Sequence, residues 1–295
     1  MIYLSHGVIP AHNPDRISHA LFLPQRLAIE HLSKRLTKYV SLERARHGEG
    51  DALTIDDATY AGFRLALLAR QYGHAVSWFI NGSNVERGLQ YFPFQLSCML
   101  DDTNSSTCFF DGSTWNLESI VGRRALRLRI KEVYMGLRNQ EEIQKLMTTF
   151  AHCLRLPGSA TIERALTTVT AGELAQAVST GVDLQNHGWR HLNLRMLSDG
   201  ERKVEVISNE EYLAQFRQAT TCIFAPPFGQ HVPMAFSKNQ FILLADRRLP
   251  PAYRTRTLIN RVDLLNAIFE PPVRTTSLGM AVAIRNRGIN QAPAG

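Results

Sequence analysis

Residues 52–80 read ALTIDDATYAGFRLALLARQYGHAVSWFI, and this stretch decides the fold class. Residues 52–55 and 76–80 are short apolar runs of the kind that form buried strands. Between them, residues 63–72 predict a helix that ends at Gly73, a residue suited to a left-handed helix cap. A strand, a helix and a second strand within about 30 residues make a βαβ unit, so this stretch predicts a parallel sheet.

The same alternation of strands and helices recurs on both sides of this unit. A strand is predicted at residues 3–9, and the apolar spacing of residues 23–36 predicts a helix packed on one side. In the second half, strands are predicted at residues 182–185, 222–224 and 241–244, and helices at residues 171–180, 209–219 and 258–269. A length of 295 residues suits one α/β barrel of such units, although length alone would also allow two domains.

The middle third of the chain departs from this alternation. Residues 94–99 and 107–110, joined by the polar residues 101–106, suggest a hairpin. Residues 117–165 are mainly helical, with no strand runs between the helices. We therefore interpret residues 94–165 as a mainly helical insertion, and residues 271–295 as a loose C-terminal tail.

The charge balance permits an acidic partner without requiring one. The chain has 33 Lys+Arg and 26 Asp+Glu, a net charge of +7. The densest basic cluster, residues 123–131, is interleaved with leucine and isoleucine, which favours a solvated helix face. Because neither an aromatic stacking set nor a groove-entering motif accompanies it, we expect no nucleic-acid partner.

The start of the chain lacks the basic segment and apolar run of a secretory signal, and nowhere do about 18 apolar residues follow one another. We therefore expect a cytoplasmic protein without a transmembrane segment.

The four cysteines form no C-x-x-C pair and are expected to be free thiols: Cys98, Cys108, Cys153 and Cys222. The oligomeric state is left open.

Several polar residues follow predicted strands, where barrels of repeated βα units gather their reactive groups. Asp56 and Asp57 end one strand and His187 ends another, while the turn at residues 225–229 ends a third. His191 follows His187 by four residues, so one helical turn would place both imidazoles on one side. Alone, the histidine pair is better explained by ordinary core or surface histidines, and the aspartate pair is ambiguous because aspartates often end strands and cap helices. Two imidazoles and a carboxylate together predict a catalytic metal site.

These residues carry a resemblance to a known family. Residues 53–58, Leu-Thr-Ile-Asp-Asp-Ala, resemble the T-F-D-D-G motif of NodB-like polysaccharide deacetylases, carbohydrate esterase family 4. Residues 186–191, Asn-His-Gly-Trp-Arg-His, resemble the family's H-x-x-x-H motif. Residues 5–8 are similar to the Y-H-x-V start of one bacterial subgroup, residues 169–174 to the helix before the histidines, and residues 224–229 to F-R-P-P-Y-G.

The similarity covers residues 1–270, which implies a single deacetylase-like domain. Its expected fold is a distorted (β/α) barrel with a mainly helical insertion, which the same subgroup also has. The implied activity is metal-dependent hydrolysis of an N-acetyl group on an amino sugar or glycan precursor. Expected substrates are N-acetylated sugars, glycans, and nucleotide- or lipid-linked sugar precursors.

The resemblance also implies roles for individual residues. Asp57, His187 and His191 would hold one divalent metal ion, expected to be zinc. Asp56 would act as general base towards a water that the metal activates. The turn that would contact the substrate and supply a backbone N–H to the oxyanion consists of Pro227, Phe228 and Gly229.

The sequence departs from the family pattern beside the general base. Ala58 replaces the usual glycine, a mild change unless that backbone needs a positive φ. Ala225 stands where the family has an arginine that steadies the base. Arg190, inside the histidine motif, is one candidate to take its place.

The second departure from the family pattern concerns the residue that donates a proton to the leaving amine. Residues 243–246, Leu-Leu-Ala-Asp, stand where the family has L-L-H-D, whose histidine protonates the leaving amine. Ala245 has no proton to give, and His6 or His231 could supply one, although each is better explained as an ordinary loop histidine. These gaps leave two alternatives: a degenerate member that only binds glycan, or a hydrolase of a non-sugar amide or imide. The sugar and the metal are not determined by the sequence.

Overall fold

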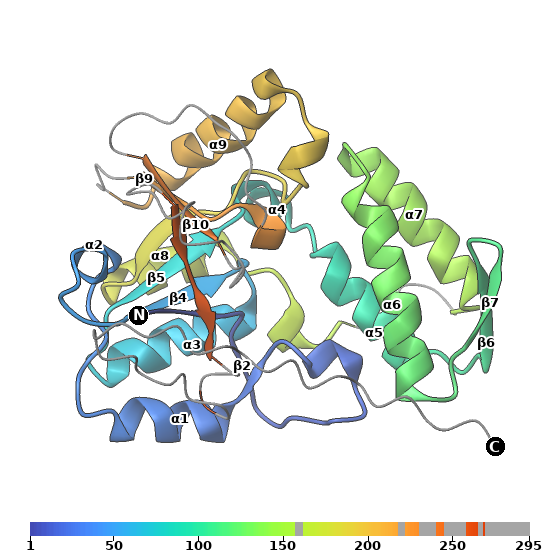
Figure 1. Ribbon diagram of the computed structural model, residues 1–295, viewed down its shortest axis with the longest axis horizontal. Coiled ribbons are helices and arrows are strands. Elements are labelled where there is room, and N and C mark those ends of the chain that lie inside the picture. The colour runs from blue at the N-terminus through green and yellow to red at the C-terminus, as the bar shows by residue number, and fades with distance from the viewer. Residues whose placement is uncertain (157–161, 218–221, 230–239, 245–257, 265–267, 269–295) are drawn as a thin grey trace, which may run out of the picture.

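The computed structural model describes residues 1–156, 162–217, 222–229, 240–244, 258–264 and 268 of the chain. At its centre lies one sheet whose strands follow the order β11-β10-β9-β8-β5-β4-β1-β12 (Figure 1). All neighbouring strands in this sheet run parallel. The strands are β1 (Ile2–Ser5), β4 (Ala52–Asp56), β5 (Val76–Ile80), β8 (Asp183–Asn186), β9 (Cys222–Phe224), β10 (Gln240–Leu244), β11 (Leu258–Asn260) and β12 (Val262–Asp263).

The two edges of this sheet meet at one residue. β11 pairs with β10 and β12 pairs with β1, and only Arg261 separates β11 from β12 along the chain. Residues 258–263 therefore bring the two edges together, and the sheet curls into the predicted distorted barrel. The helix predicted at residues 258–269 is wrong over residues 258–263, because pairing with strands from both ends of the chain decides their conformation.

The larger helices connect these strands, and their first turns have side-chain caps. Thr59 accepts the Gly62 N–H at the start of α3 (Tyr60–Gln71). Capping boxes begin α8 (Ala171–Ser179), at Thr170, and α9 (Asp199–Leu213), at Ser198. The other strands and α-helices of this part are β2 (Val8–Ile9), β3 (Leu23–Pro24), α1 (Gln25–Lys34), α2 (Leu42–Arg46) and α4 (Gly82–Arg87).

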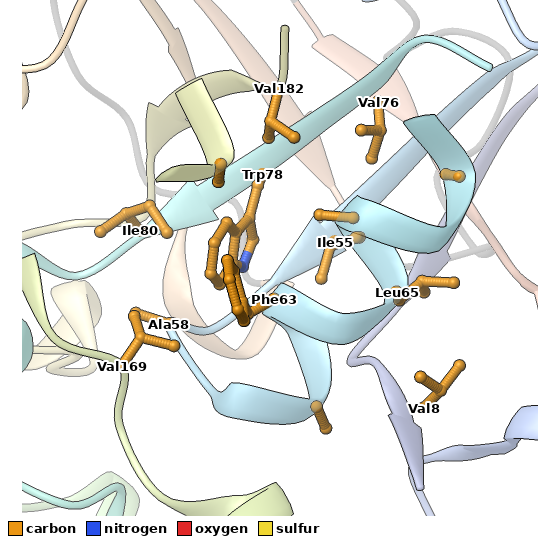
Figure 2. Close-up of a cluster of buried hydrophobic side chains, with 14 of the residues drawn as sticks. Val8, Ile55, Ala58, Phe63, Leu65, Val76, Trp78, Ile80, Val169 and Val182 are labelled. Carbon is orange, nitrogen blue, oxygen red and sulfur yellow. The ribbon is translucent and has the colours of Figure 1, made fainter. Parts of the chain in front are cut away.

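The main hydrophobic core reaches the carboxyl end of β4. Trp78 on β5 is fully buried and stacks on Phe63 of α3, with ring centroids 6.3 Å apart (Figure 2). Its indole N–H donates to the backbone carbonyl of Asp57 at 2.8 Å. Gly7 allows α3 to approach β1, because its φ is 130° and a Cβ there would lie 2.2 Å from the carbonyl carbon of Ala61. The core therefore fixes the backbone that carries Asp57.

The insertion forms a helical group on one side of the barrel (Figure 1). Its elements are α5 (Phe92–Asp102), β6 (Thr107–Phe110), β7 (Ser113–Asn116), α6 (Ile120–Met135) and α7 (Gln140–Cys153). The predicted hairpin between residues 94–99 and 107–110 is wrong, because residues 94–99 lie in α5. Pro93 stands in the first turn of that helix, where proline is well tolerated. The true hairpin turns at Asp111 and Gly112, both at positive φ.

No helix among the described residues is both long and apolar enough to cross a membrane. Cys98 and Cys108 are buried, Cys153 is half-buried, and all three are free, as predicted. The predicted tail, residues 271–295, lies outside the described residues. The division of the chain into a domain and a tail stays a prediction.

Candidate functional site

Three predicted metal ligands converge beyond the carboxyl ends of β4 and β8. Asp57 follows β4, and His187 follows β8. The Asp57 Oδ1 atom lies 3.5 Å from His187 Nε2 and 3.2 Å from His191 Nε2. One ligand atom from each residue can be chosen so that all three lie within 4.8 Å of one another, and all three residues are buried. The sequence prediction that these side chains meet is therefore correct in its geometry.

The spacing of these atoms suits a small divalent cation. Two ligands, each about 2.1 Å from a tetrahedral zinc ion, lie about 3.4 Å apart. Asp57 Oδ1 is buried and accepts no hydrogen bond from the described residues. Burial acts to raise the pKa of Asp57, but His191 and His187 outweigh burial and hold it well below its usual value. The result is an ionised, unsatisfied carboxylate oxygen between two imidazoles, which fits a metal ion.

Hydrogen bonds on the far side of each imidazole leave Nε2 facing Asp57. His187 Nδ1 lies 2.6 Å from the carbonyl oxygen of Ala225, which can only accept, so Nδ1 carries the proton. The Tyr134 hydroxyl donates to the His191 carbonyl at 3.1 Å and lies 3.5 Å from His191 Nδ1. This arrangement, in which a second group fixes the tautomer of a ligating histidine, is typical of metal sites.

The histidine motif lies in a loop, so the predicted helical turn is wrong. β8 ends at Asn186, and the residues that follow include Gly188 at a φ of 82° and His191 at a φ of 55°. The Asn186 side-chain oxygen accepts the Gly188 N–H at 2.8 Å and thereby tightens this loop. Asp57 and Phe228 also have positive φ, at 66° and 65°. Unusual backbone conformations of this kind gather at functional sites, where surrounding contacts must hold them.

A buried chain of hydrogen bonds joins the carboxylate loop to the histidine loop. The Ala58 N–H donates to the Tyr91 hydroxyl at 2.7 Å, and that hydroxyl donates to Asn81 Oδ1 at 2.9 Å. Asn81 Nδ2 in turn donates to the His187 carbonyl at 2.6 Å. Tyr91 and Asn81 therefore set the distance between Asp57 and His187. Sequence reasoning missed both, although Asn81 follows β5 directly, where the strand-end rule applies.

The second carboxylate, Asp56, has an internal cation as its partner. Arg261 donates to Asp56 Oδ1 at 2.6 Å and to Oδ2 at 2.7 Å, and its side chain is 0% exposed. Burial acts to raise the pKa of Asp56, but Arg261, together with His187 and His6, outweighs burial and lowers it. Asp56 is therefore held ionised, with each oxygen keeping a lone pair.

Arg261, and not Arg190, supplies the positive charge beside Asp56. Arg190 Nε donates to Glu205 Oε1 at 2.6 Å, and its backbone N–H donates to Oε2 at 2.8 Å. The candidate role of Arg190 is therefore wrong, because the fully buried Glu205 on α9 binds it instead. Ala225 contributes only its backbone, whose N–H donates to the Asn186 carbonyl at 3.0 Å.

His6 lies beside Asp56 at the barrel rim. In the parallel pair of β1 and β4, Ser5 lies opposite Ile55. His6 and Asp56, which follow these two residues, therefore lie side by side at the ends of the two strands. His6 Nδ1 is buried and has no hydrogen-bond partner among the described residues. His231 and Ala245, the other residues of the proton-donor question, lie outside the described residues.

The turn after β9 covers one side of the histidine pair. The Phe228 ring packs on His191 with centroids 5.0 Å apart, and it packs on Tyr134 at 5.5 Å. Pro227 before it is buried, and Gly229 after it has a φ of 63°. The predicted substrate-contacting turn therefore lies against a predicted metal ligand.

Comparisons with known proteins point to one family. The family model described as "Polysaccharide deacetylase" matches residues 44–239. The Streptococcus pyogenes deacetylase PplD, solved in complex with acetate, is similar with a TM-score of 0.52 and 12% identity over 89% of this chain and 90% of that chain. IcaB from Ammonifex degensii is similar with a TM-score of 0.50 and 11% identity over the same shares, 89% and 90%. No curated protein matches the sequence.

Proposed function

Because this chain belongs to the polysaccharide deacetylase family, we propose that it is a metal-dependent hydrolase that removes an N-acetyl group from an amino sugar. The observation that carries the proposal is the pair of 3.2 and 3.5 Å separations between Asp57 Oδ1 and the two imidazole Nε2 atoms. The proposed substrates are N-acetylated glycans and sugar precursors linked to a nucleotide or a lipid. The proposed location is the cytoplasm.

Asp56 is the proposed general base. A divalent cation held by Asp57, His187 and His191, proposed to be zinc, would supply Lewis acidity towards water and the amide oxygen. Arg261 keeps Asp56 ionised and fixes the plane of its carboxylate through two hydrogen bonds of 2.6 and 2.7 Å. A base held in this way can accept a proton from water without first reorienting.

Two further groups complete the proposed site. His6 is the proposed donor of the proton that the leaving amine needs. Its position next to Asp56, at the end of the neighbouring strand, supports this role. The Phe228 backbone N–H is the proposed contact for the oxyanion, and the packing of Phe228 on His191 supports that role. Pro227 and Gly229 would hold this turn beside the substrate.

The proposal is tested by metal content and acetate release measured on the same preparations. Purified protein is analysed for bound metal, and acetate release is measured from chitooligosaccharides and from UDP-N-acetylglucosamine. Asp56→Asn is expected to keep the metal and to lose about 10²- to 10⁴-fold in kcat/KM. The matched control is Asp199→Asn, which changes a carboxylate that is 85% exposed on α9, and it should leave both readouts unchanged.

The outcomes separate the candidate functions. Absence of stoichiometric divalent metal, or full activity of Asp56→Asn, would contradict the proposal. Glycan binding in calorimetry without acetate release would favour a binding protein. Cleavage of cyclic amides, with no N-acetyl sugar accepted, would favour a non-sugar amide or imide substrate.

A further inference from the structure

The basic cluster of the sequence lies on α6, and the structure divides it between two faces of that helix. Arg124 is exposed, and Arg129 pairs with two exposed carboxylates. Arg127 and Lys131 are half-buried, and their spacing of four residues places them on one face of the helix. Only part of this cluster is therefore the solvated surface that the sequence indicates.

Lys131 lies beside the turn that is proposed to contact the substrate. Its ammonium nitrogen is 5.9 Å from the centre of the Phe228 ring, close to the outer limit of a cation–π contact. The same ring packs on the candidate metal ligand His191, with centroids 5.0 Å apart. It also packs on Tyr134, which follows Lys131 by three residues on α6. A group bound by Lys131 would therefore lie close to the candidate metal site.

Neither of these two cations forms an ion pair with a described residue. Arg127 Nε donates to the Ser97 hydroxyl at 2.7 Å, and its other guanidinium nitrogens have no hydrogen-bond partner in the described part of the chain. Asp101 is the carboxylate that acts on Arg127, but its oxygens already accept two backbone N–H groups at 2.8 and 2.9 Å. Asp101 also lies 3.7 and 3.8 Å from two other guanidinium groups. Arg127 and Lys131 are therefore free to bind an anion.

The two positive charges are partly shielded from water and lie close to each other. Burial lowers the pKa of Arg127 although Asp101 opposes the change, and burial together with Arg127 lowers the pKa of Lys131. A half-buried cation without a counter-charge is unfavourable, and a bound anion would offset that penalty. A phosphate group suits this pair, because its several oxygens can accept from a guanidinium and an ammonium group together.

We propose that Arg127 and Lys131 bind a phosphate group of the substrate, and that the sugar that is deacetylated is one linked to phosphate. This inference rests on the proposed function and chooses, among its substrates, the nucleotide- or lipid-linked sugar precursors over neutral glycans. The insertion then supplies the phosphate-binding cations from α6, while the barrel carries the reacting groups.

The test compares N-acetylglucosamine 1-phosphate and UDP-N-acetylglucosamine with neutral N-acetylglucosamine. Lys131→Met removes the charge but keeps an unbranched side chain beside Phe228, and Arg127→Gln removes the second charge. Each variant should raise the KM for the phosphorylated sugars about 10-fold, the loss expected for one hydrogen bond between charged groups. The KM for N-acetylglucosamine should change by less than about twofold, and kcat should stay similar for each sugar.

The matched control is Arg124→Gln, which removes the same charge from the exposed side of the same helix. It should leave all three KM values unchanged, and Lys131→Arg, which keeps the charge, should retain the preference for phosphorylated sugars. A rise for both phosphorylated sugars would place the bound phosphate next to the sugar, and a rise for UDP-N-acetylglucosamine alone would place it one phosphate further away. No rise in either variant, or an equal rise for the neutral sugar, would overturn the inference.

Calorimetry separates this inference from the proposed function. UDP-N-acetylglucosamine is titrated into Asp56→Asn with and without Lys131→Met, so that binding is measured without turnover. Any contact between phosphate and a bound metal ion is the same in both proteins. Binding about 10-fold weaker in the double variant supports the phosphate site even if the wild-type protein releases no acetate, a result that would remove only the proposed function. Equal binding in both proteins would overturn the phosphate site alone.

Discussion

The two carboxylates at the end of β4 are neighbours in sequence and have opposite surroundings. Asp56 points to Arg261, which binds both of its oxygens at 2.6 and 2.7 Å. Asp57 points to two imidazole Nε2 atoms, and its buried Oδ1 has no hydrogen-bond partner among the described residues. Among the described residues, Asp56 therefore has a permanent cation as its partner, and Asp57 has an oxygen that could bind a metal ion.

This difference explains how adjacent aspartates can have separate roles. A carboxylate paired with a fixed guanidinium is held ionised but is not free to move onto a metal. A carboxylate oxygen that faces two imidazole nitrogens and accepts no hydrogen bond from the described residues has lone pairs open to a divalent cation. Asp57 is thus suited to be a ligand and Asp56 to be a base, and the predictions below test that division.

The largest effect is expected at Asp57. Asp57→Asn removes the only anionic member of the triad, so metal affinity should fall. Activity should drop by about 10³-fold or more, which corresponds to a loss of about 4 kcal/mol of transition-state stabilisation. Bound metal is measured by elemental analysis after dialysis, alongside acetate release. Asp56→Asn is the matched comparison, because it should lose activity and keep the metal. Equal metal loss in both variants would remove the division of roles.

The next effect is expected at Arg261. Arg261→Gln leaves Asp56 buried without its cation, which should lower the free energy of unfolding by about 3–5 kcal/mol. The Asp56→Asn, Arg261→Gln double variant should be more stable than Arg261→Gln alone, because it leaves no unpaired buried charge. Denaturant unfolding curves of the four proteins measure this coupling. Additive losses would mean that the two side chains do not depend on each other.

The triad was predictable from the sequence because its signals are local. Short apolar runs fix β5 at Val76–Ile80 and β9 at Cys222–Phe224, as predicted. Polar residues directly after such runs fall on one rim of a parallel barrel, whatever the loops do in between. That is why Asp57 and His187 lie close together as predicted, even though the histidine motif is a loop and not a helical turn.

Arg261 was not predictable in the same way. It lies 205 residues from Asp56, in a segment whose apolar spacing also fits a helix. Only the pairing of β11 with β10 and of β12 with β1 makes this segment extended and turns Arg261 towards β4. No local sequence pattern marks an arginine that will pair with a distant carboxylate. Arg261 becomes the partner of Asp56 only when the sheet closes, so this pair is found from the structure.

A smaller effect is expected from the hydrogen-bond chain that ties the two loops together. Tyr91→Phe keeps the ring but leaves the Ala58 N–H and Asn81 Oδ1 without their buried partner, which should cost about 1–3 kcal/mol. Because the chain sets the distance from Asp57 to His187, metal affinity should also fall by about 10- to 100-fold. Thermal unfolding and metal titration measure the two parts. A change in stability with unchanged metal affinity would show that the chain supports only the core.

The smallest effect is expected next to the two carboxylates, at Ala58. The residue with positive φ in this loop is Asp57, at 66°, and Ala58 is not among the described residues with positive φ. Restoring the family's glycine by Ala58→Gly therefore relieves no strain. It removes a buried methyl group and adds backbone freedom, so the free energy of unfolding should fall by about 1 kcal/mol. Metal content and kcat/KM should stay unchanged, since the Ala58 N–H still donates to Tyr91. A gain in activity would instead mean that the alanine distorts the loop that carries Asp57, and the contrast between the two carboxylates would then need another cause.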